Sequence, residues 1–179
     1  MCFKLEKYGV RLIRLTHDKI ELVRQWRNHP KISIYMEFRE EITPEMQEAW
    51  FRKINNDINY YFLIIAEDKE IGLINVRDIN YKIGQGESGI FIWDDEYLNT
   101  PISFQASFCL TDFCFDELHL ISLQSHVLKD NSRAIKFNIA MGYQLSPNQD
   151  DKYNQEYTLT QEKYITHRNK ILKLLRYGN

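Results

Sequence analysis

Few residues of this sequence have types and spacings that could support chemistry, and several classes of site are excluded at once. The three cysteines, Cys2, Cys109 and Cys114, form no Cys-x-x-Cys pair, so we expect neither a disulfide framework nor a zinc site. Cys109 and Cys114 lie in an apolar stretch and are interpreted as buried thiols of a reducing compartment. His119 and His126 flank a strand without companion metal ligands and are interpreted as structural. No Ser-His-Asp or Cys-His arrangement is indicated.

Arg27 is one candidate for recognising a ligand. Its planar guanidinium matches the paired oxygens of a phosphate or a carboxylate. Arg27 lies between Trp26 and Asn28, and Met36 follows in the same region. Trp26 also continues the apolar stripe of an expected helix, so a position in the core is the alternative for it, and Met36 has the same two interpretations.

Composition indicates an ordinary globular chain. Its 179 residues fit a single domain over 1–179, and 44% hydrophobic residues are enough for a core. The net charge is −2 and no run of five basic residues occurs, so we expect neither nucleic acid nor a membrane as partner. The charged N-terminus argues against a signal peptide, and no apolar run approaches the roughly 20 residues of a membrane helix. We therefore expect a cytoplasmic protein.

The candidate residues must be positioned by alternating helices and strands. Strands are expected at 10–15, 60–66, 71–76, 87–93 and 121–127. Asp18 with Glu21 resembles a capping box, and the Thr43-Pro44-Glu45 run predicts a helix with Met46, Trp50 and Ile54 as its buried stripe. Further helices are expected at 103–118, 131–141 and 160–176.

This order predicts an α/β (α+β) fold. Three consecutive strands form an antiparallel meander, and the later strand–helix–strand crossing is parallel. The result is a mixed, mainly antiparallel central sheet with helices on both faces.

Three local motifs in this order resemble the GCN5-related N-acetyltransferases, over about residues 10–145. The first is Asn131 to Tyr143, in which an Asn opens a short helix that ends in Gly-Tyr. The second is the Glu87 to Ile92 strand. The third is Trp26 to Pro30 with Met36, followed by Ile42 to Glu45. The third motif is most similar to nucleotide-aminosugar N-acetyltransferases of the pseudaminic acid pathway, and also to acetyltransferases of ribosomal-protein N-termini.

The resemblance implies that acetyl-CoA is the co-substrate, without a metal, and that the acceptor is a small amine. It places Glu87 as the group that draws a proton from the amine; an exposed strand-edge charge is the alternative. It implies an acceptor site at Trp26, Arg27, Asn28 and Met36, in a monomer or homodimer. The cofactor would contact Ile90, Phe91, Ile92, Asn99, Thr100, Ile102, Ser103, Asn131, Arg133 and Lys136. Asn131 has helix capping as its alternative, and Arg133 and Lys136 have a solvated helix face.

The sequence departs from the family pattern at three places. Asn99 and Pro101 stand where the family loop has glycines that let the backbone approach phosphate. Asn138 stands where many members have a proton-donating Tyr, and Gln47 where the aminosugar enzymes tend to have His. An N-acetyltransferase acting on a small primary amine, such as a nucleotide-linked aminosugar, is the leading interpretation. A peptide N-terminal acetyltransferase, or a binding or regulatory module that has lost turnover, are the alternatives.

Overall fold

The computed structural model describes residues 3–177 and contains one eight-stranded sheet. The strand order is β1-β2-β3-β4-β5-β6-β8-β7. All neighbours pair antiparallel except β5 and β6, which are parallel, so the expected mixed, mainly antiparallel sheet is confirmed. The strands are β1 (Lys4–Lys7), β2 (Val10–Arg14), β3 (Tyr60–Ala66), β4 (Lys69–Asn80), β5 (Gln85–Ile92), β6 (Ser122–Leu128), β7 (Gln144–Leu145) and β8 (Asn154–Thr160).

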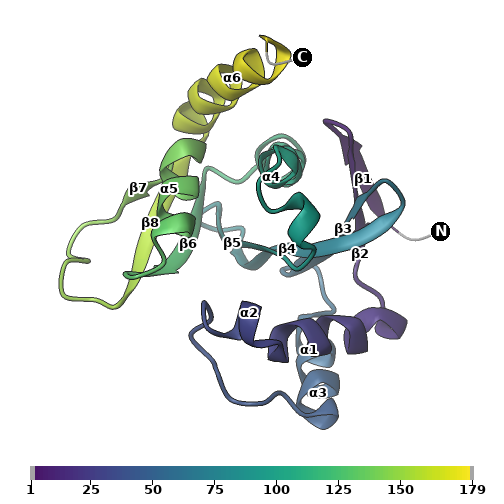
Figure 1. Ribbon diagram of the computed structural model, residues 1–179. Coiled ribbons are helices and arrows are strands. Elements are labelled where there is room, and N and C mark those ends of the chain that lie inside the picture. Colours follow the sequence, from purple (N-terminus) through teal and green to yellow (C-terminus); the bar gives the residue numbers. More distant parts are fainter. Residues whose placement is uncertain (1–2, 178–179) are drawn as a thin grey trace.

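Helices cover both faces of the sheet, as Figure 1 shows. One layer contains α1 (Ile20–Asn28), α2 (Pro30–Ser33) and α3 (Pro44–Ile54). The other contains α4 (Ile102–Asp112), α5 (Ser132–Met141) and α6 (Gln161–Tyr177). Short turns complete the chain: η1 (His17–Lys19), η2 (Asp95–Tyr97) and the π-helical turn η3 (Phe113–Glu117) that extends α4. None of the helices in the described part of the chain is both long and apolar enough to cross a bilayer.

Three strands were not expected from the sequence. β1 forms a hairpin with β2 through a turn at Tyr8 and Gly9, whose φ angles are 59° and 82°. Two consecutive positive φ angles are typical of the tight turns whose twist matches paired strands. β8 pairs along the whole outer edge of β6, and the two-residue β7 pairs with β8. The segment before α6 is therefore part of the sheet.

One of the two expected helix starts is confirmed and the other is wrong. Thr43 caps α3, since its hydroxyl accepts a hydrogen bond from Met46 N at 3.3 Å. Asp18 does not cap α1: it lies in η1 and accepts a hydrogen bond from the Thr16 hydroxyl at 2.6 Å. The residue preceding α1 is Lys19, whose side chain makes no capping bond.

The buried stripe of α3 also differs from the prediction. Met46 is 42% exposed and Trp50 only partly buried, whereas Phe51 joins Ile54 in the core. Gln47 is buried as well, and its side-chain amide donates to Ile20 O at 2.8 Å. The polar group at this position therefore joins α3 to α1 within the core.

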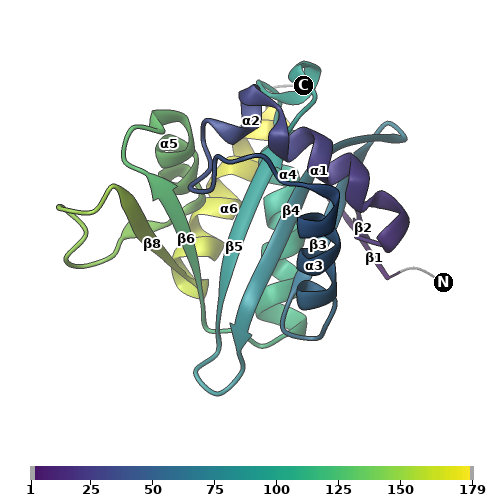
Figure 2. The same cartoon turned by 90° about the horizontal axis from the view of Figure 1, so that it is seen from below.

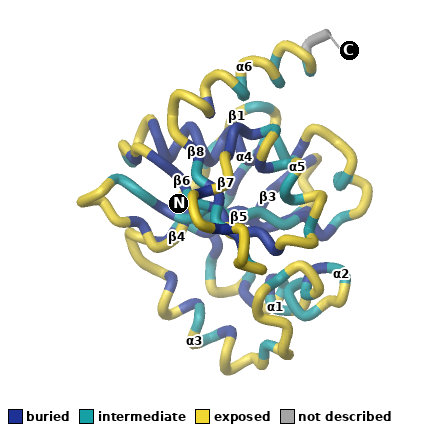
Figure 3. Tube along the Cα trace, turned by 90° about the vertical axis from the view of Figure 1, so that its left-hand side faces the viewer, coloured by how far each residue is buried: buried dark blue, intermediate teal, exposed yellow. Residues whose placement is uncertain are grey.

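The sheet separates two hydrophobic clusters, and Figure 3 shows the buried tube concentrated along it. The larger cluster lies under α4 and α6, and the smaller one lies under α1 and α3. Cys109 and Cys114 are buried in the larger cluster, as expected, while Cys2 lies outside the described residues. Burial raises the pKa of the Cys109 thiol to about 11, so this thiol is protonated at neutral pH.

A buried carboxylate connects α4, α6 and the first hairpin. The Asp112 side chain is only 6% exposed and forms ion pairs with Lys7 and with Arg168, the latter at 2.7 Å. It also accepts hydrogen bonds from the hydroxyls of Tyr8 at 2.7 Å and Tyr164 at 2.5 Å. Asp112 thereby holds the closing helix, predicted at 160–176 and found at 161–177, against the domain face opposite α1–α3.

Candidate functional site

The site is built around a fork between the two parallel strands. β5 and β6 pair at Gln85↔Ser122, Gly86↔Leu123 and Glu87↔Gln124, and the pairing ends there. β5 continues to Ile92 and β6 to Leu128, and Figure 2 shows the two strands separating. Past Glu87, the edge of β5 that faces β6 therefore offers its backbone groups to a ligand, as a sheet edge does to a peptide.

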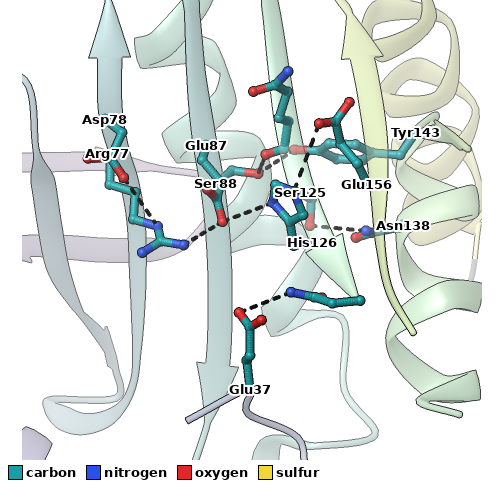
Figure 4. A network of polar contacts seen from close by, with 12 residues as sticks. Glu37, Arg77, Asp78, Glu87, Ser88, Ser125, His126, Asn138, Tyr143 and Glu156 are labelled. Carbon is teal, nitrogen blue, oxygen red and sulfur yellow. Dashed lines mark hydrogen bonds and ion pairs between the residues drawn. The ribbon is translucent and has the colours of Figure 1, made fainter. Parts of the chain in front are cut away.

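Three residues close the narrow end of the fork. The Ser88 hydroxyl donates to Gln124 O at 3.3 Å and contacts the Tyr143 hydroxyl at 2.5 Å (Figure 4). Burial raises the pKa of Tyr143, so its phenol is neutral and can donate to Ser88. The contact fastens the end of α5 to β5 directly beneath the point where the strands part.

The first turn of α4 lies after β5 and η2. Pro101 is the residue preceding the helix, and Gln105 N is bonded to Pro101 O at 3.0 Å. The amides before Gln105 belong to the first turn, where N–H groups point out of a helix without an intrahelical acceptor. Thr100 Oγ1 lies 3.4 Å from Ile102 N, so one of these amides has a local partner, and Ser103 follows it.

The loop that lacks glycines has ordinary backbone conformations. The non-glycine residues with positive φ in the described chain do not include Asn99, Thr100 or Pro101. Pro101 has φ −65° and ψ −8°, which a proline adopts without strain. The residues that stand in place of the family glycines therefore cause no backbone strain. The N–H that Pro101 lacks would have no acceptor within the helix, because Pro101 lies at the helix start.

The first turn of α5 supports this loop. Asn131 caps α5, as one interpretation predicted, accepting a hydrogen bond from Ala134 N at 3.1 Å. Arg133 donates to Leu98 O, which ties α5 to the loop before α4. Lys136 is exposed on the same helix. Of the three residues at the start of α5 and on α5 that were predicted to contact the cofactor, two thus have structural partners and Lys136 is exposed to solvent.

The side chains of β5 alternate between the two faces of the sheet. Ser88, Ile90 and Ile92 point toward the α4 side, where Ile90 and Ile92 join the larger cluster. Glu87 and Phe91 point toward the α1–α3 side, where Phe91 packs on the smaller cluster. Glu87 therefore lies on the face of the fork opposite Ser88.

A row of charged groups crosses four strands on the Glu87 face (Figure 4). Arg77 Nη2 of β4 is 2.6 Å from Glu87 Oε1 of β5. His126 Nδ1 of β6 is 3.3 Å from the same oxygen, and His126 Nε2 is 3.8 Å from Glu156 Oε2 of β8. Although burial acts to lower the pKa of Arg77, the hydrogen bond to Glu87 raises it above its usual value, so Arg77 stays charged.

Arg27 lies close to this row and has no acid partner in the part of the chain that the structure describes. Its Nε is buried and has no hydrogen-bond partner among the described residues. Burial lowers the pKa of Arg27, and Tyr61 and Arg77 are the charged or ionisable groups within electrostatic reach of it. A buried, unpaired guanidinium N–H is costly, and an anionic or carbonyl oxygen of a ligand would satisfy it.

The other predicted acceptor residues, Trp26, Asn28 and Met36, have structural partners in the same part of the fold. Trp26 stacks on Trp93, with ring centroids 5.7 Å apart and planes 4° from parallel. Asn28 uses its side-chain amide to donate to Ile42 O at 2.9 Å and to accept from Ile42 N at 2.8 Å. It therefore holds the loop that follows α2, in which Met36 packs against the smaller cluster.

Sequence reasoning missed three members of the charged row, Arg77, His126 and Glu156. Arg77 is the register partner of Glu87 in the β4–β5 hairpin. The strand expected at 71–76 ended one residue too early, and a longer expected strand would have placed Arg77 beside Glu87. His126 was interpreted as structural, yet it faces Glu87. It alternates with the buried residues Leu123, Ser125 and Val127 along β6, and that alternation was the available signal.

Known proteins resemble this chain in sequence and fold. A family model described as an acetyltransferase (GNAT) domain matches residues 10–144. The acetyltransferase PseH of Campylobacter jejuni is 29% identical over 123 residues, which cover 68% of this chain and 74% of PseH. A spermidine N-acetyltransferase of Vibrio cholerae in complex with CoA and spermine matches at TM-score 0.76 and 21% identity, covering 88% of this chain and 98% of its own. Apo FdhC, a nucleotide-linked sugar GNAT, matches at TM-score 0.78 and 20% identity, covering 96% and 98%.

Proposed function

The chain belongs to the acetyltransferase (GNAT) domain family, and we propose that the acceptor of its acetyl group is the primary amine of a nucleotide-linked aminosugar. The chain is an N-acetyltransferase that uses acetyl-CoA and acts on a small amine. Two observations support the narrower acceptor class. The sequence around Trp26 to Pro30 resembles the aminosugar enzymes, and PseH is similar over two thirds of the chain.

The fork is the proposed place of acetyl-CoA, which supplies the thioester and an anionic pyrophosphate. The residues fit it, because the free edge of β5 from Ser88 to Ile92 can pair with amide groups of an extended ligand. The first-turn amides of α4, around Ser103, and the hydroxyl of Thr100 can bind phosphate oxygens at the positive end of the helix. Asn131 and Arg133 support the loop, and Lys136 can reach a phosphate from solvent.

Glu87 is proposed to take the proton of the acceptor amine. An ammonium group cannot attack a thioester, so a base must receive the proton. Glu87 points toward the acceptor side of the fork, and its partner Arg77 restricts the rotamers of its side chain. The departing thiolate needs no strong acid, since thiols have pKa values of about 8 to 9. Asn138, in the position of the family Tyr, is buried and donates to the Ser125 hydroxyl at 3.1 Å.

The observation that carries the acceptor class is the buried, unpartnered Nε of Arg27 beside Arg77. Since Glu87 already pairs with Arg77, the guanidinium of Arg27 is the one that favours a substrate bringing phosphate or another anionic group with its amine. A polyamine, which brings only positive charge, would leave Arg27 without a partner and be repelled by it. A peptide N-terminus is the second acceptor class, and a binding module without turnover is the alternative to an enzyme.

Thermal unfolding with acetyl-CoA separates the enzyme from a module that has lost its cofactor. At 100 times its dissociation constant a ligand stabilises the folded state by about 2.7 kcal/mol. We expect such a shift, followed by CoA thiol release when a nucleotide-linked aminosugar is added. A shift without thiol release for any amine would favour the binding module. Release with peptide amines and none with aminosugars would identify the second acceptor class.

A further inference from the structure

His126 lies between two carboxylates on neighbouring strands. Its Nδ1 is 3.3 Å from Glu87 Oε1 and its Nε2 is 3.8 Å from Glu156 Oε2. The first of these distances is within reach of a hydrogen bond, whereas the second is long enough that a water molecule would have to bridge it. The side chain of Glu87 is 20% exposed, whereas those of His126 and Glu156 are 35% and 29% exposed, so both groups beyond Glu87 are more open to solvent than Glu87 is.

The register explains why His126 reaches across the opening. Glu87 is the last residue of β5 that pairs with β6, opposite Gln124. His126 is two residues further along β6, on the same face as Gln124, where the strands have begun to separate. Glu156 is its direct register partner on β8. The imidazole therefore spans the mouth of the fork on the side where the acceptor would approach.

The charged groups around His126 come from every neighbouring strand. Glu87 faces it from β5 and Glu156 from β8, while Arg77 of β4 acts through Glu87. Glu37, in the loop after α2, lies nearby in Figure 4 and accepts a hydrogen bond from Asn154 of β8 at 3.1 Å. Arg77 and His126 both contact Oε1 of Glu87, so among the described residues Oε2 is the oxygen left for an amine.

We propose that His126 is a relay that takes the amine proton from Glu87 and passes it to Glu156 and solvent. This inference rests on the proposed function. The amine nitrogen bonds to the acetyl carbonyl carbon, the C–S bond breaks, and its electron pair leaves on sulfur. The amine proton goes to Glu87, whose protonated carboxyl rotates to present it to Nδ1 of His126, and a proton then leaves from Nε2 to Glu156 and solvent.

The relay has a physical reason in the Arg77 contact. A protonated Glu87 has lost its charge and hence its ion pair with Arg77, whose guanidinium stays charged. Passing the proton to His126 restores that pair before the next turnover. Since His126 acts through Glu87, it is a positioning and relay residue that does not itself touch the acceptor.

Kinetics of His126→Gln and Glu156→Gln test the relay, with His17→Gln as the matched control. His17 also pairs with a glutamate, Glu48, at 2.9 Å, on the exposed surface of η1 and α3. A general base is worth about 10²- to 10⁴-fold in rate, and a relay behind it should be worth less, about tenfold. We expect His126→Gln to lower kcat about tenfold with both KM values unchanged, a smaller loss for Glu156→Gln, and none for His17→Gln.

Two further readouts distinguish a relay from a structural contact. Added imidazole should raise the activity of His126→Ala and leave the wild type unaffected. In the free enzyme, the NMR chemical shifts of the His126 ring should change on Glu87→Gln, and those of His17 should not. A wild-type kcat in His126→Gln, or a change confined to the acceptor KM, would overturn the relay while leaving the proposed function intact. A wild-type enzyme that acetylates no amine would overturn both.

Discussion

Arg77 and Glu87 face each other in the β4–β5 hairpin, with Arg77 Nη2 2.6 Å from Glu87 Oε1. The contact lies on the α1–α3 face of the sheet, one residue before the strand turns Ser88 toward the opposite face. It holds the carboxylate at the point where β5 leaves β6. The position of Glu87 therefore follows from hairpin register and strand alternation together.

Glu87→Gln should lower kcat by about 10²- to 10⁴-fold, because the amide cannot accept the amine proton. The loss should shrink as pH rises, since the free amine is then already abundant. Calorimetry should show unchanged affinity for acetyl-CoA. Glu6→Gln, on the exposed edge strand β1, is the matched control and should behave as the wild type. Full turnover by Glu87→Gln at pH 7 would remove this residue from the mechanism.

Arg27→Ala should raise the KM of the acceptor and leave that of acetyl-CoA nearly unchanged. Hydrogen bonds to charged groups contribute about 1.5–3 kcal/mol, so an increase of about 10- to 100-fold is expected. Steady-state kinetics with each substrate varied in turn measure both constants. Arg52→Ala, on an exposed position of α3, should change neither. An equal effect of Arg27→Ala on both substrates would instead indicate damage to the fold.

The double variant Asn99→Gly with Pro101→Gly should bind acetyl-CoA as tightly as the wild type or more tightly. Glycine allows closer approach of the backbone to phosphate. The native loop has no strain for glycine to relieve, so any gain comes from that approach. Isothermal titration calorimetry gives the dissociation constant. Loss of binding in the double variant would mean that the native loop holds acetyl-CoA through the side chains of Asn99 or the rigidity of Pro101.

Asp112→Asn should lower the free energy of unfolding at pH 7 by about 2–3 kcal/mol, because charged partners lose their carboxylate. Burial alone would raise the pKa of Asp112, but hydrogen bonds from Lys7, Tyr164, Tyr8 and Arg168 lower it overall. A carboxylate with a lowered pKa stabilises the fold above its unfolded pKa of about 3.9, and that contribution is lost as pH falls through the folded value. Urea unfolding should therefore show the deficit of the variant shrinking below about pH 4. A deficit independent of pH would contradict this account.

The sequence predicted the elements that have a strong local signal. The apolar run at Tyr60–Ala66 is β3, the Thr43-Pro44 start is the beginning of α3, and Asn131 caps α5. β8 was missed because its buried residues alternate with polar ones in a segment that is polar overall. Its place is determined by pairing with β6, a contact between distant parts of the chain that local patterns do not encode.

The same limit applied to the site. In the structure β5 alternates so that Glu87 faces away from Ile90 and Ile92, but the sequence left this register open because Gly89 permits a bulge. The contact of Glu87 with His126 depends on how far β5 and β6 pair before they separate, which only the assembled sheet defines. Likewise, the unpartnered Nε of Arg27 follows from burial under neighbouring elements and not from residue type.

The account is tested most directly by comparing kcat/KM for acetyl transfer to three amines: a nucleotide-linked aminosugar, the same aminosugar without the nucleotide, and spermidine. CoA thiol release and the mass of the product measure the reaction with each acceptor. We expect kcat/KM to be highest for the nucleotide-linked aminosugar, at least about tenfold lower for the free aminosugar, and lowest for spermidine. Arg27→Ala should reduce the ratio of kcat/KM between the nucleotide-linked and the free aminosugar. Equal or greater kcat/KM for spermidine would contradict it.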